Sequence, residues 1–304
     1  MQNSSEKLVL YKERDLGQMM GLAANLIRRH YKHMFRTIGI MTLPLVLMAS
    51  TLYYLGTASI IKNFDLALGK VPQNNYNLNI LLSYIAIYLA YCAILWACVY
   101  YVKLYDEKGP ENFTWNDIWA KVFKHGWKLL FSNIAIFLII GIPMGLSFLL
   151  LFTVILAPAT FIIIVGLASF TQLWTILYLY EEASLFDALD SSIKLMKKQW
   201  WKAIELLICS YLIVFGLMSL PAAIGLLIGF ASGGIGLEAG LNEDTLFFVL
   251  LIQNLSMVLS FLSSFFLALS FTAFYLSNKE RFNKISLQNR VAMLAENKIS
   301  STYS

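Results

Sequence analysis

Residues 129–180 read LLFSNIAIFLIIGIPMGLSFLLLFTVILAPATFIIIVGLASFTQLWTILYLY, and none of them is charged. A helix needs about 20 apolar residues to cross the hydrocarbon layer of a membrane, so this stretch is too long for one crossing. Pro158 interrupts it at a position where the chain can turn. The stretch therefore predicts two membrane-spanning helices, at 129–152 and 159–180, joined by a short apolar hairpin.

The rest of the chain has a similar composition. Its 304 residues are 59% apolar and 13% charged, with a mean hydropathy of +0.66. This is about half the charge of a typical soluble domain, which excludes a soluble globule. Four further charge-poor runs are long enough to cross a membrane. We therefore expect an all-α, polytopic membrane protein in which residues 37–276 form a six-span bundle, with the remaining spans at 37–58, 78–102, 203–230 and 245–276.

The positive charges predict the orientation of these spans. Of the 23 Lys and Arg residues, 21 lie on one side of the six-span pattern, and only Lys62 and Lys70 lie on the other. Because cytoplasmic segments carry the excess of Lys and Arg, we expect an inner-membrane protein whose N-terminal segment, 1–36, and tail, 277–304, are both cytoplasmic. The basic N-terminal segment is too long for a signal peptide, so the first span should be retained. We expect the inward charge to meet anionic lipid headgroups and no nucleic acid.

Two related motifs start amphipathic segments on the cytoplasmic side. Thr114 and Asp117, like Ser184 and Asp187, have the spacing of a capping box, which predicts surface helices at about 114–126 and 184–199. A comparable segment at about 13–32 precedes the first span. These helices end in aromatic–lysine pairs, which suit the headgroup level of a membrane; the predicted interface anchors are Tyr31, Lys32, Trp127, Lys128, Trp201 and Lys202.

The same order occurs three times, which predicts three hairpin-like units, each made of a cytoplasmic amphipathic helix and two spans. The first span of each unit also contains one proline, at Pro44, Pro143 or Pro221. A genuine internal repeat is the favoured interpretation. The alternative is coincidence, because such residues are common at membrane interfaces.

Residues 181–202, EEASLFDALDSSIKLMKKQWWK, resemble the cytoplasmic segment of a loose group of bacterial six-span membrane proteins. This group, most of whose members have no assigned activity, includes the membrane domain appended to some glycerophosphodiester phosphodiesterases. In it an acidic residue, an Ala-Leu pair, a Ser and a closing Trp precede the fifth span. The resemblance implies the six-span topology. It implies no phosphodiesterase activity, because only a short polar tail follows the last span.

The residues themselves predict neither a catalytic, a cofactor nor a metal site. No predicted span contains an aspartate, and the three histidines, His30, His33 and His125, flank the membrane. His30 and His33 are three residues apart, a spacing that can hold a metal. Their basic neighbours favour instead a cationic surface that meets lipid headgroups.

Polar and aromatic stripes mark the spans that face the bundle interior. In the last span, serines and amides recur at helical spacing, which predicts interhelical hydrogen bonds or a substrate path. The second span has a tyrosine stripe, more typical of packing than of a ligand site. Residues that could line a cavity are Gln253, Asn254, Ser256, Ser260, Tyr84, Tyr88 and Tyr91. Close helix packing is predicted at glycines four residues apart, namely Gly225, Gly229 and Gly233.

Together these features predict a non-enzymatic accessory, scaffold or regulatory protein of envelope or lipid homeostasis. Its partners would be membrane lipid and a membrane protein or a second copy of the chain. The alternative is a small permease or lipid transporter with a cavity lined by the second, fifth and sixth spans. The missing intramembrane charge argues against ion coupling in such a transporter.

If the aromatic residues anchor the surface helices, replacing both Trp127 and Trp201 with Ala should loosen them. We expect faster protease cleavage after Lys124 and Lys198 in inside-out vesicles, because mobile helix ends are cleaved first. Unchanged cleavage rates would refute the anchoring role.

Overall fold

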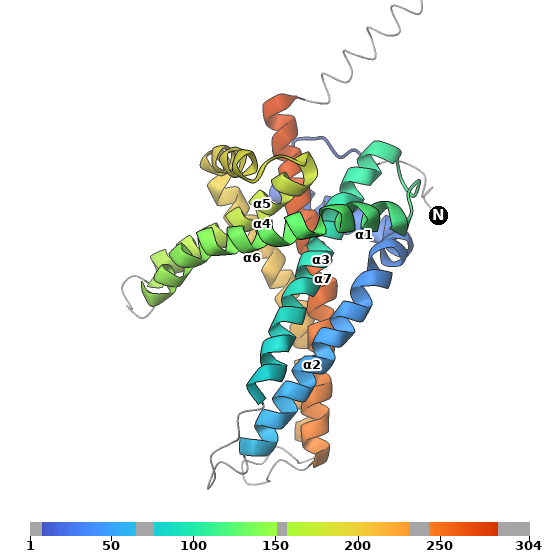
Figure 1. The fold of residues 1–304 in the computed structure, drawn as a ribbon, viewed down its shortest axis with the longest axis vertical. Coiled ribbons are helices and arrows are strands. Elements are labelled where there is room, and N and C mark those ends of the chain that lie inside the picture. Colours follow the sequence, from blue (N-terminus) through green and yellow to red (C-terminus); the bar gives the residue numbers. More distant parts are fainter. Residues whose placement is uncertain (1–7, 65–75, 151–156, 232–242, 285–304) are drawn as a thin grey trace, which may run out of the picture. The chain divides into compact units, whose positions relative to one another are not determined.

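A computed structural model describes residues 8–64, 76–150, 157–231 and 243–284, and all regular structure in these ranges is helical. This confirms the all-α class. Figure 1 labels the seven α-helices, and a short π-helix, η1, links the first two. The elements are α1 (Leu16–Met34), η1 (Phe35–Gly39), α2 (Ile40–Phe64), α3 (Tyr76–Lys108), α4 (Trp115–Leu150), α5 (Ala157–Glu181), α6 (Leu185–Ala231) and α7 (Glu243–Asn283).

The helices fit an integral membrane protein. By length and composition, four described segments can cross a membrane, in α3, α5, α6 and α7. A fifth crossing is possible where Leu16–Gly39 and Thr42–Tyr53 form a pair bent by 67°. In α4 the described apolar segment, Ile134–Pro143, is shorter than a full crossing. The six-span topology therefore stays a prediction.

Four prolines that the sequence analysis singled out lie within helices. Pro158 is the second residue of α5, which begins at Ala157, so it occupies the first turn, where a missing N–H costs nothing. The prolines at 44, 143 and 221 lie inside α2, α4 and α6. α5 thus begins close to the predicted start of the span at 159, and the predicted hairpin before it falls on residues 151–156, which lie outside the described residues.

Two of the three predicted surface helices end at a break inside a longer helix, and the third has no such break. α4 continues as one helix from Trp115 to Leu150, and α6 continues from Leu185 to Ala231 with non-helical torsion angles at Gln199 (φ −135°, ψ 24°). α1 has a similar break at His30 (φ −118°, ψ 21°) and then continues into η1 and α2. The expected end at 199 coincides with the break in α6, and the expected end at 32 lies two residues after the break in α1, whereas α4 has no break at the expected end at 126. An aromatic–lysine pair favours an interface, but it leaves the backbone N–H groups free to continue the helix.

The chain divides into two compact units. Unit 1 contains the segment up to His33, Val99–Ser210 and the segment from Phe266 onward, whereas unit 2 contains Met34–Cys98 and Tyr211–Phe265. Unit 2 is strongly apolar. Its charged residues within the described ranges are Arg36, Lys62, Glu243 and Asp244.

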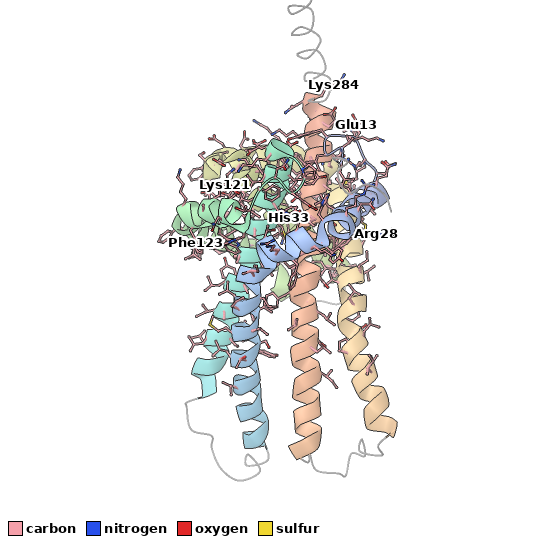
Figure 2. All side chains as sticks on the ribbon, turned by 90° about the vertical axis from the view of Figure 1, so that its right-hand side faces the viewer. Glu13, Arg28, His33, Lys121, Phe123 and Lys284 are labelled. Atoms are coloured by element: carbon pink, nitrogen blue, oxygen red, sulfur yellow. The ribbon has the colours of Figure 1, made fainter. Side chains whose placement is uncertain are left out.

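Unit 2 is built from α2 and from parts of α3, α6 and α7, which run side by side in both ribbon views (Figures 1 and 2). Side chains of α2, α3 and α7, including Val46, Ile94 and Phe261, enclose a cavity of only about 20 Å³. A cavity of this size has room for about one water molecule. These three helices therefore pack closely.

In unit 1, α4 packs against α5, and α5 packs against α6. The indole of Trp174 is fully buried and donates a hydrogen bond to the carbonyl of Leu185 (3.1 Å). Gly166 faces the ring of Trp200. Figure 2 labels five of the polar or charged side chains of this unit, Glu13, Arg28, His33, Lys121 and Lys284, and the apolar Phe123.

The contact between Gly166 and Trp200 leaves no room for a side chain. A Cβ atom at position 166 would lie 2.2 Å from Cζ2 of Trp200, so Gly166→Ala should move the ring and lower stability by about 1–3 kcal/mol. Thermal unfolding in detergent would measure this. Gly21→Ala is the matched control because a Cβ there meets nothing within 4 Å. If both variants unfold alike, the close approach of α5 and α6 is wrong.

Candidate functional site in unit 1

Both predicted capping boxes are present and set the first residues of α4 and α6. At α4 the carboxylate of Asp117 accepts hydrogen bonds from the Thr114 N–H (2.7 Å) and hydroxyl (2.9 Å). At α6 the Ser184 hydroxyl donates to Asp187 (2.6 Å), and the Asp187 N–H donates back to the Ser184 oxygen (3.2 Å). These bonds satisfy donors that a helix start leaves open.

Asp117 also joins the start of α4 to the end of α3. Its carboxylate accepts a hydrogen bond from the Lys108 ammonium (2.7 Å). This bond, followed by those from Thr114, lowers the pKa of Asp117 from 3.8 to about 2. Because the pKa is lowered in the folded state, the stabilisation is complete above about pH 4 and is lost as the pH falls towards 2.

The turns before α4 and α6 share a second feature. Glu111 and Glu182 both have positive φ, 60° and 52°, a conformation that costs a non-glycine residue roughly 1–2 kcal/mol. Each carboxylate reaches another element: Glu111 contacts His30 of α1 (3.1 Å), and Glu182 accepts a hydrogen bond from Lys103 of α3 (2.7 Å). Such backbone strain is typical of functional or structurally critical positions.

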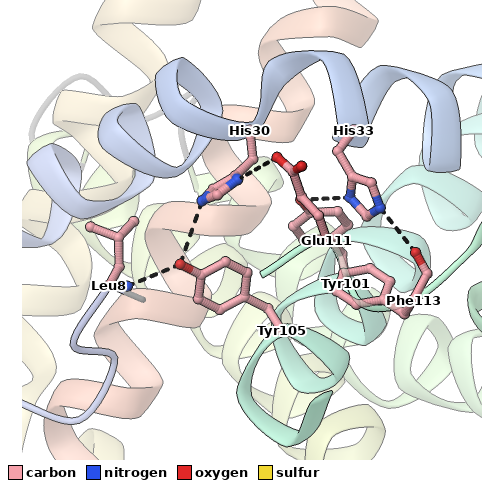
Figure 3. Close-up of polar contacts among 7 residues, drawn as sticks. All are labelled: Leu8, His30, His33, Tyr101, Tyr105, Glu111 and Phe113. Carbon is pink, nitrogen blue, oxygen red and sulfur yellow. Dashed lines mark hydrogen bonds and ion pairs between the residues drawn. The ribbon is translucent and has the colours of Figure 1, made fainter. Parts of the chain in front are cut away.

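A chain of hydrogen bonds passes through His30, whose side chain is fully buried (Figure 3). The Tyr105 hydroxyl accepts from the Leu8 N–H (2.9 Å), so its proton is free to donate to Nε2 of His30, 3.5 Å away. Nδ1 of His30 then carries the proton and donates to the Glu111 carboxylate (3.1 Å). Through these bonds the imidazole links the N-terminal segment, α1, α3 and the following turn.

His33 makes the next contact along α1. Its Nε2 lies 2.9 Å from the Phe113 carbonyl, which only accepts, so Nε2 carries the proton. Nδ1 then accepts from the Tyr101 hydroxyl at 3.2 Å. The rings of His33, Tyr101 and Phe113 also pack edge to face or tilted, with centroids 4.9–5.7 Å apart.

The expectation of a cationic histidine surface was therefore wrong. His30 is 1% exposed and faces α3 instead of lipid headgroups. The spacing of His30 and His33 predicted that they share a helix face. That face is covered by Tyr101 and Tyr105 of α3. Within the described residues, no three His, Cys, Asp or Glu side chains are grouped to hold a metal.

A second polar cluster joins the ends of α5 and α7. Glu181 accepts hydrogen bonds from the Tyr275 hydroxyl (2.6 Å) and the Lys279 ammonium (3.1 Å). Tyr180 packs on Tyr275 with ring centroids 5.2 Å apart, and its hydroxyl lies 3.1 Å from that of Tyr11. The tyrosine–glutamate–lysine cluster thus also holds the N-terminal segment.

The environment of Tyr11 and Arg14 shows how closely this segment is held. Burial raises the pKa of Tyr11 to about 12. The Arg14 guanidinium donates to the carbonyls of Val9, Leu10 and Lys12. The backbone N–H of Arg14 donates to the Ser277 hydroxyl (2.9 Å). Burial also lowers the pKa of Arg14. The contacts of Tyr11 with Tyr180 and of Arg14 with Ser277 join residues 169 and 263 positions apart, so no local sequence pattern predicts them.

The predicted cavity-lining residues are only partly described. Tyr84 and Tyr88 are exposed, at 58% and 38%, and Tyr91, Ser256 and Ser260 are half-buried. The backbones of Gln253 and Asn254 lie in α7, but their side chains fall outside the described set. Next to them, the hydroxyls of Ser263 and Ser264 donate to carbonyls four residues earlier in α7, so these two serines bond within their own helix. The cavity itself stays a prediction.

Among the predicted interface anchors, Tyr31 and Trp201 are 57% and 62% exposed. The Lys32 ammonium lies 5.9 Å from the Tyr31 ring centroid. Trp127 and Lys128 are part of α4, but their side chains are outside the described set. Gly225 and Gly229 are part of α6, but their surroundings are also outside the described set, and Gly233 lies outside the described residues. Membrane anchoring and glycine packing therefore stay predictions.

Comparisons with family models, with curated proteins and with solved structures found no match. The resemblance of residues 181–202 to the six-span group is therefore not tested by them. The site in unit 1 is defined by its own geometry.

The chain of hydrogen bonds through His30 makes a measurable contribution to stability. His30→Ala leaves Tyr105 and Glu111 without their shared partner, and we expect a loss of about 1–3 kcal/mol in thermal unfolding. Arg29→Ala, at the exposed neighbouring position, is the control and should change stability little. Equal effects of the two substitutions would contradict the buried position of His30.

Proposed function

We propose that this chain is a non-enzymatic accessory or scaffold protein of the inner membrane that acts through the cytoplasmic surface of unit 1. In this proposal six spans, arranged in three hairpin-like units, hold both termini in the cytoplasm. The observation that carries it is the set of side-chain bonds that ties the N-terminal segment, α1 and the ends of α3, α5 and α7 together.

These bonds support a rigid surface instead of a reaction centre. The polar side chains that join these elements bind each other: His30 binds Glu111, Lys103 binds Glu182, and Lys279 binds Glu181. A general acid or base must be able to reach a substrate, whereas these groups are used in contacts between helices. Such an arrangement suits the presentation of a fixed surface to lipid or to another protein.

The surface of unit 1 also presents large apolar side chains. Phe186 is 73% exposed, Phe123 is 64% exposed and Trp201 is 62% exposed. Phe186 is the second residue of α6, close to the charged turn at Glu182. Exposed aromatic residues beside charges are typical of sites that bind a partner or a membrane surface.

One observation favours the alternative, a small lipid transporter. An apolar cavity of about 580 Å³ lies among α4, α5 and α6 in unit 1, beside Pro143, with Lys197 among its lining residues. Its size is that of a ligand site. It involves different helices from the cavity that the sequence predicted, which was assigned to the second, fifth and sixth spans.

Two measurements on the purified full chain distinguish these functions. A scaffold should co-purify in mild detergent with a membrane-protein partner in a fixed ratio, read by mass spectrometry, and Phe186→Ser should reduce that ratio by removing an exposed apolar contact. In proteoliposomes the same protein should exchange fluorescent phospholipid between leaflets no faster than vesicles without protein.

The matched control is Leu212→Ser, an exposed apolar position farther along α6 in unit 2, which should leave the partner ratio unchanged. Rapid lipid exchange with no partner in a fixed ratio would overturn the scaffold proposal in favour of transport.

A further inference from the structure

A polar cavity of about 300 Å³ lies within unit 1, between the start of α1, the kink of α6 and the last turns of α7. The buried polar lining residues are Ser277 and Asn278, whereas Glu13, Asp15, Gln18 and Arg281 are exposed. The remaining lining residues are Arg14, Met19, Gln199 and Lys202. The cavity thus has a buried polar wall and an exposed charged rim.

Charges of both signs line this cavity without pairing. Lys202 and Arg281 bring two positive charges, and Glu13 and Asp15 bring two negative ones. None of these four side chains takes part in an ion pair with a described residue. Arg14 is different, because its guanidinium is held by the carbonyls of Val9, Leu10 and Lys12. The free charges are therefore balanced, which suits a ligand that carries both signs.

The cavity lies where the chain passes from charged to apolar sequence. Lys202 directly follows the exposed Trp201 and precedes the long apolar part of α6. Ser277, Asn278 and Arg281 lie at the end of the apolar segment Val258–Asn283. Tryptophan and lysine at such a boundary are typical of the headgroup level of a membrane, so the cavity lies at the depth of a lipid headgroup.

We propose that this cavity binds a phosphate that carries a primary ammonium on a short arm, the headgroup of an aminophospholipid. Lys202 and Arg281 would bind the phosphate, and Glu13 and Asp15 would bind the ammonium. A volume of 300 Å³ holds about ten water molecules, which exceeds the number of non-hydrogen atoms in phosphoethanolamine. The inference deepens the proposed function, since it names a lipid class for the surface of unit 1.

The test uses the full chain purified in mild detergent and incubated with equal amounts of phosphatidylethanolamine, phosphatidylcholine and phosphatidylglycerol. Native mass spectrometry then reads which lipid stays bound. We expect phosphatidylethanolamine to be preferred, because phosphatidylcholine cannot donate hydrogen bonds to the carboxylates and phosphatidylglycerol has no positive charge. The double variant Lys202→Gln/Arg281→Gln should lose about tenfold in retention of this lipid.

A second double variant tests the ammonium contacts alone. Glu13→Gln/Asp15→Asn should keep the affinity for phosphate but abolish the preference for phosphatidylethanolamine over phosphatidylcholine. Lys194→Gln is the matched control, because Lys194 is on the same helix, is 72% exposed and pairs with Asp190 outside the cavity. Lys202→Arg/Arg281→Lys should retain binding, which separates loss of charge from loss of folding.

Competition with free phosphoethanolamine identifies the source of the ligand. Displacement only by a large excess assigns the cavity to the membrane lipid, and displacement at equal concentration assigns it to the soluble compound. The inference fails if the wild-type chain prefers phosphatidylglycerol, or if both double variants bind as the wild type does. In that case a partner that co-purifies in a fixed ratio would still support the scaffold function, so the two failures are distinguishable.

Discussion

The constraint on which unit 1 depends is that polar groups leaving water must find hydrogen-bond partners inside the protein. His30 meets this constraint with both ring nitrogens, one towards Glu111 and one towards Tyr105. Tyr105 in turn accepts from the backbone of Leu8. Since each partner belongs to a different segment of the chain, satisfying one buried imidazole fixes the N-terminal segment, α1 and the end of α3 together.

The turns before α4 and α6 follow the same logic twice. Each has a capping box that starts the helix and a glutamate with positive φ whose carboxylate reaches a neighbouring element. The segment before α1, which is the first of the three proposed repeats, departs from this pattern. Among the described residues, the Asp15 side chain makes no hydrogen bond that caps the helix. There the start of α1 is held through Arg14 and Ser277. The internal repeat therefore stays a prediction.

The kink of α6 at Gln199 separates two kinds of surface in unit 1. Met196, Lys197 and Trp200 line the apolar cavity, whereas Gln199 and Lys202 line the polar one. Because successive residues of a helix point in different directions, a short segment can serve both. A lipid-binding role for this part of the chain would therefore need no separate domain. Two residues of the aromatic–lysine motif, Trp200 and Lys202, line these cavities.

The sequence by itself determined the helical class, the apolar segments, the helix starts at Thr114 and Ser184 and the place of Pro158, because these depend on local composition and on bonds between residues three or four positions apart. It predicted the break of α6 at 199 but not that α4 continues past 126, because the sequence there contains no local stop signal. Only the tertiary structure decided that His30 is buried and that Glu13, Lys202 and Arg281 surround one cavity. Those environments are made by residues distant in the chain, and no local pattern records which distant side chain will cover a given face.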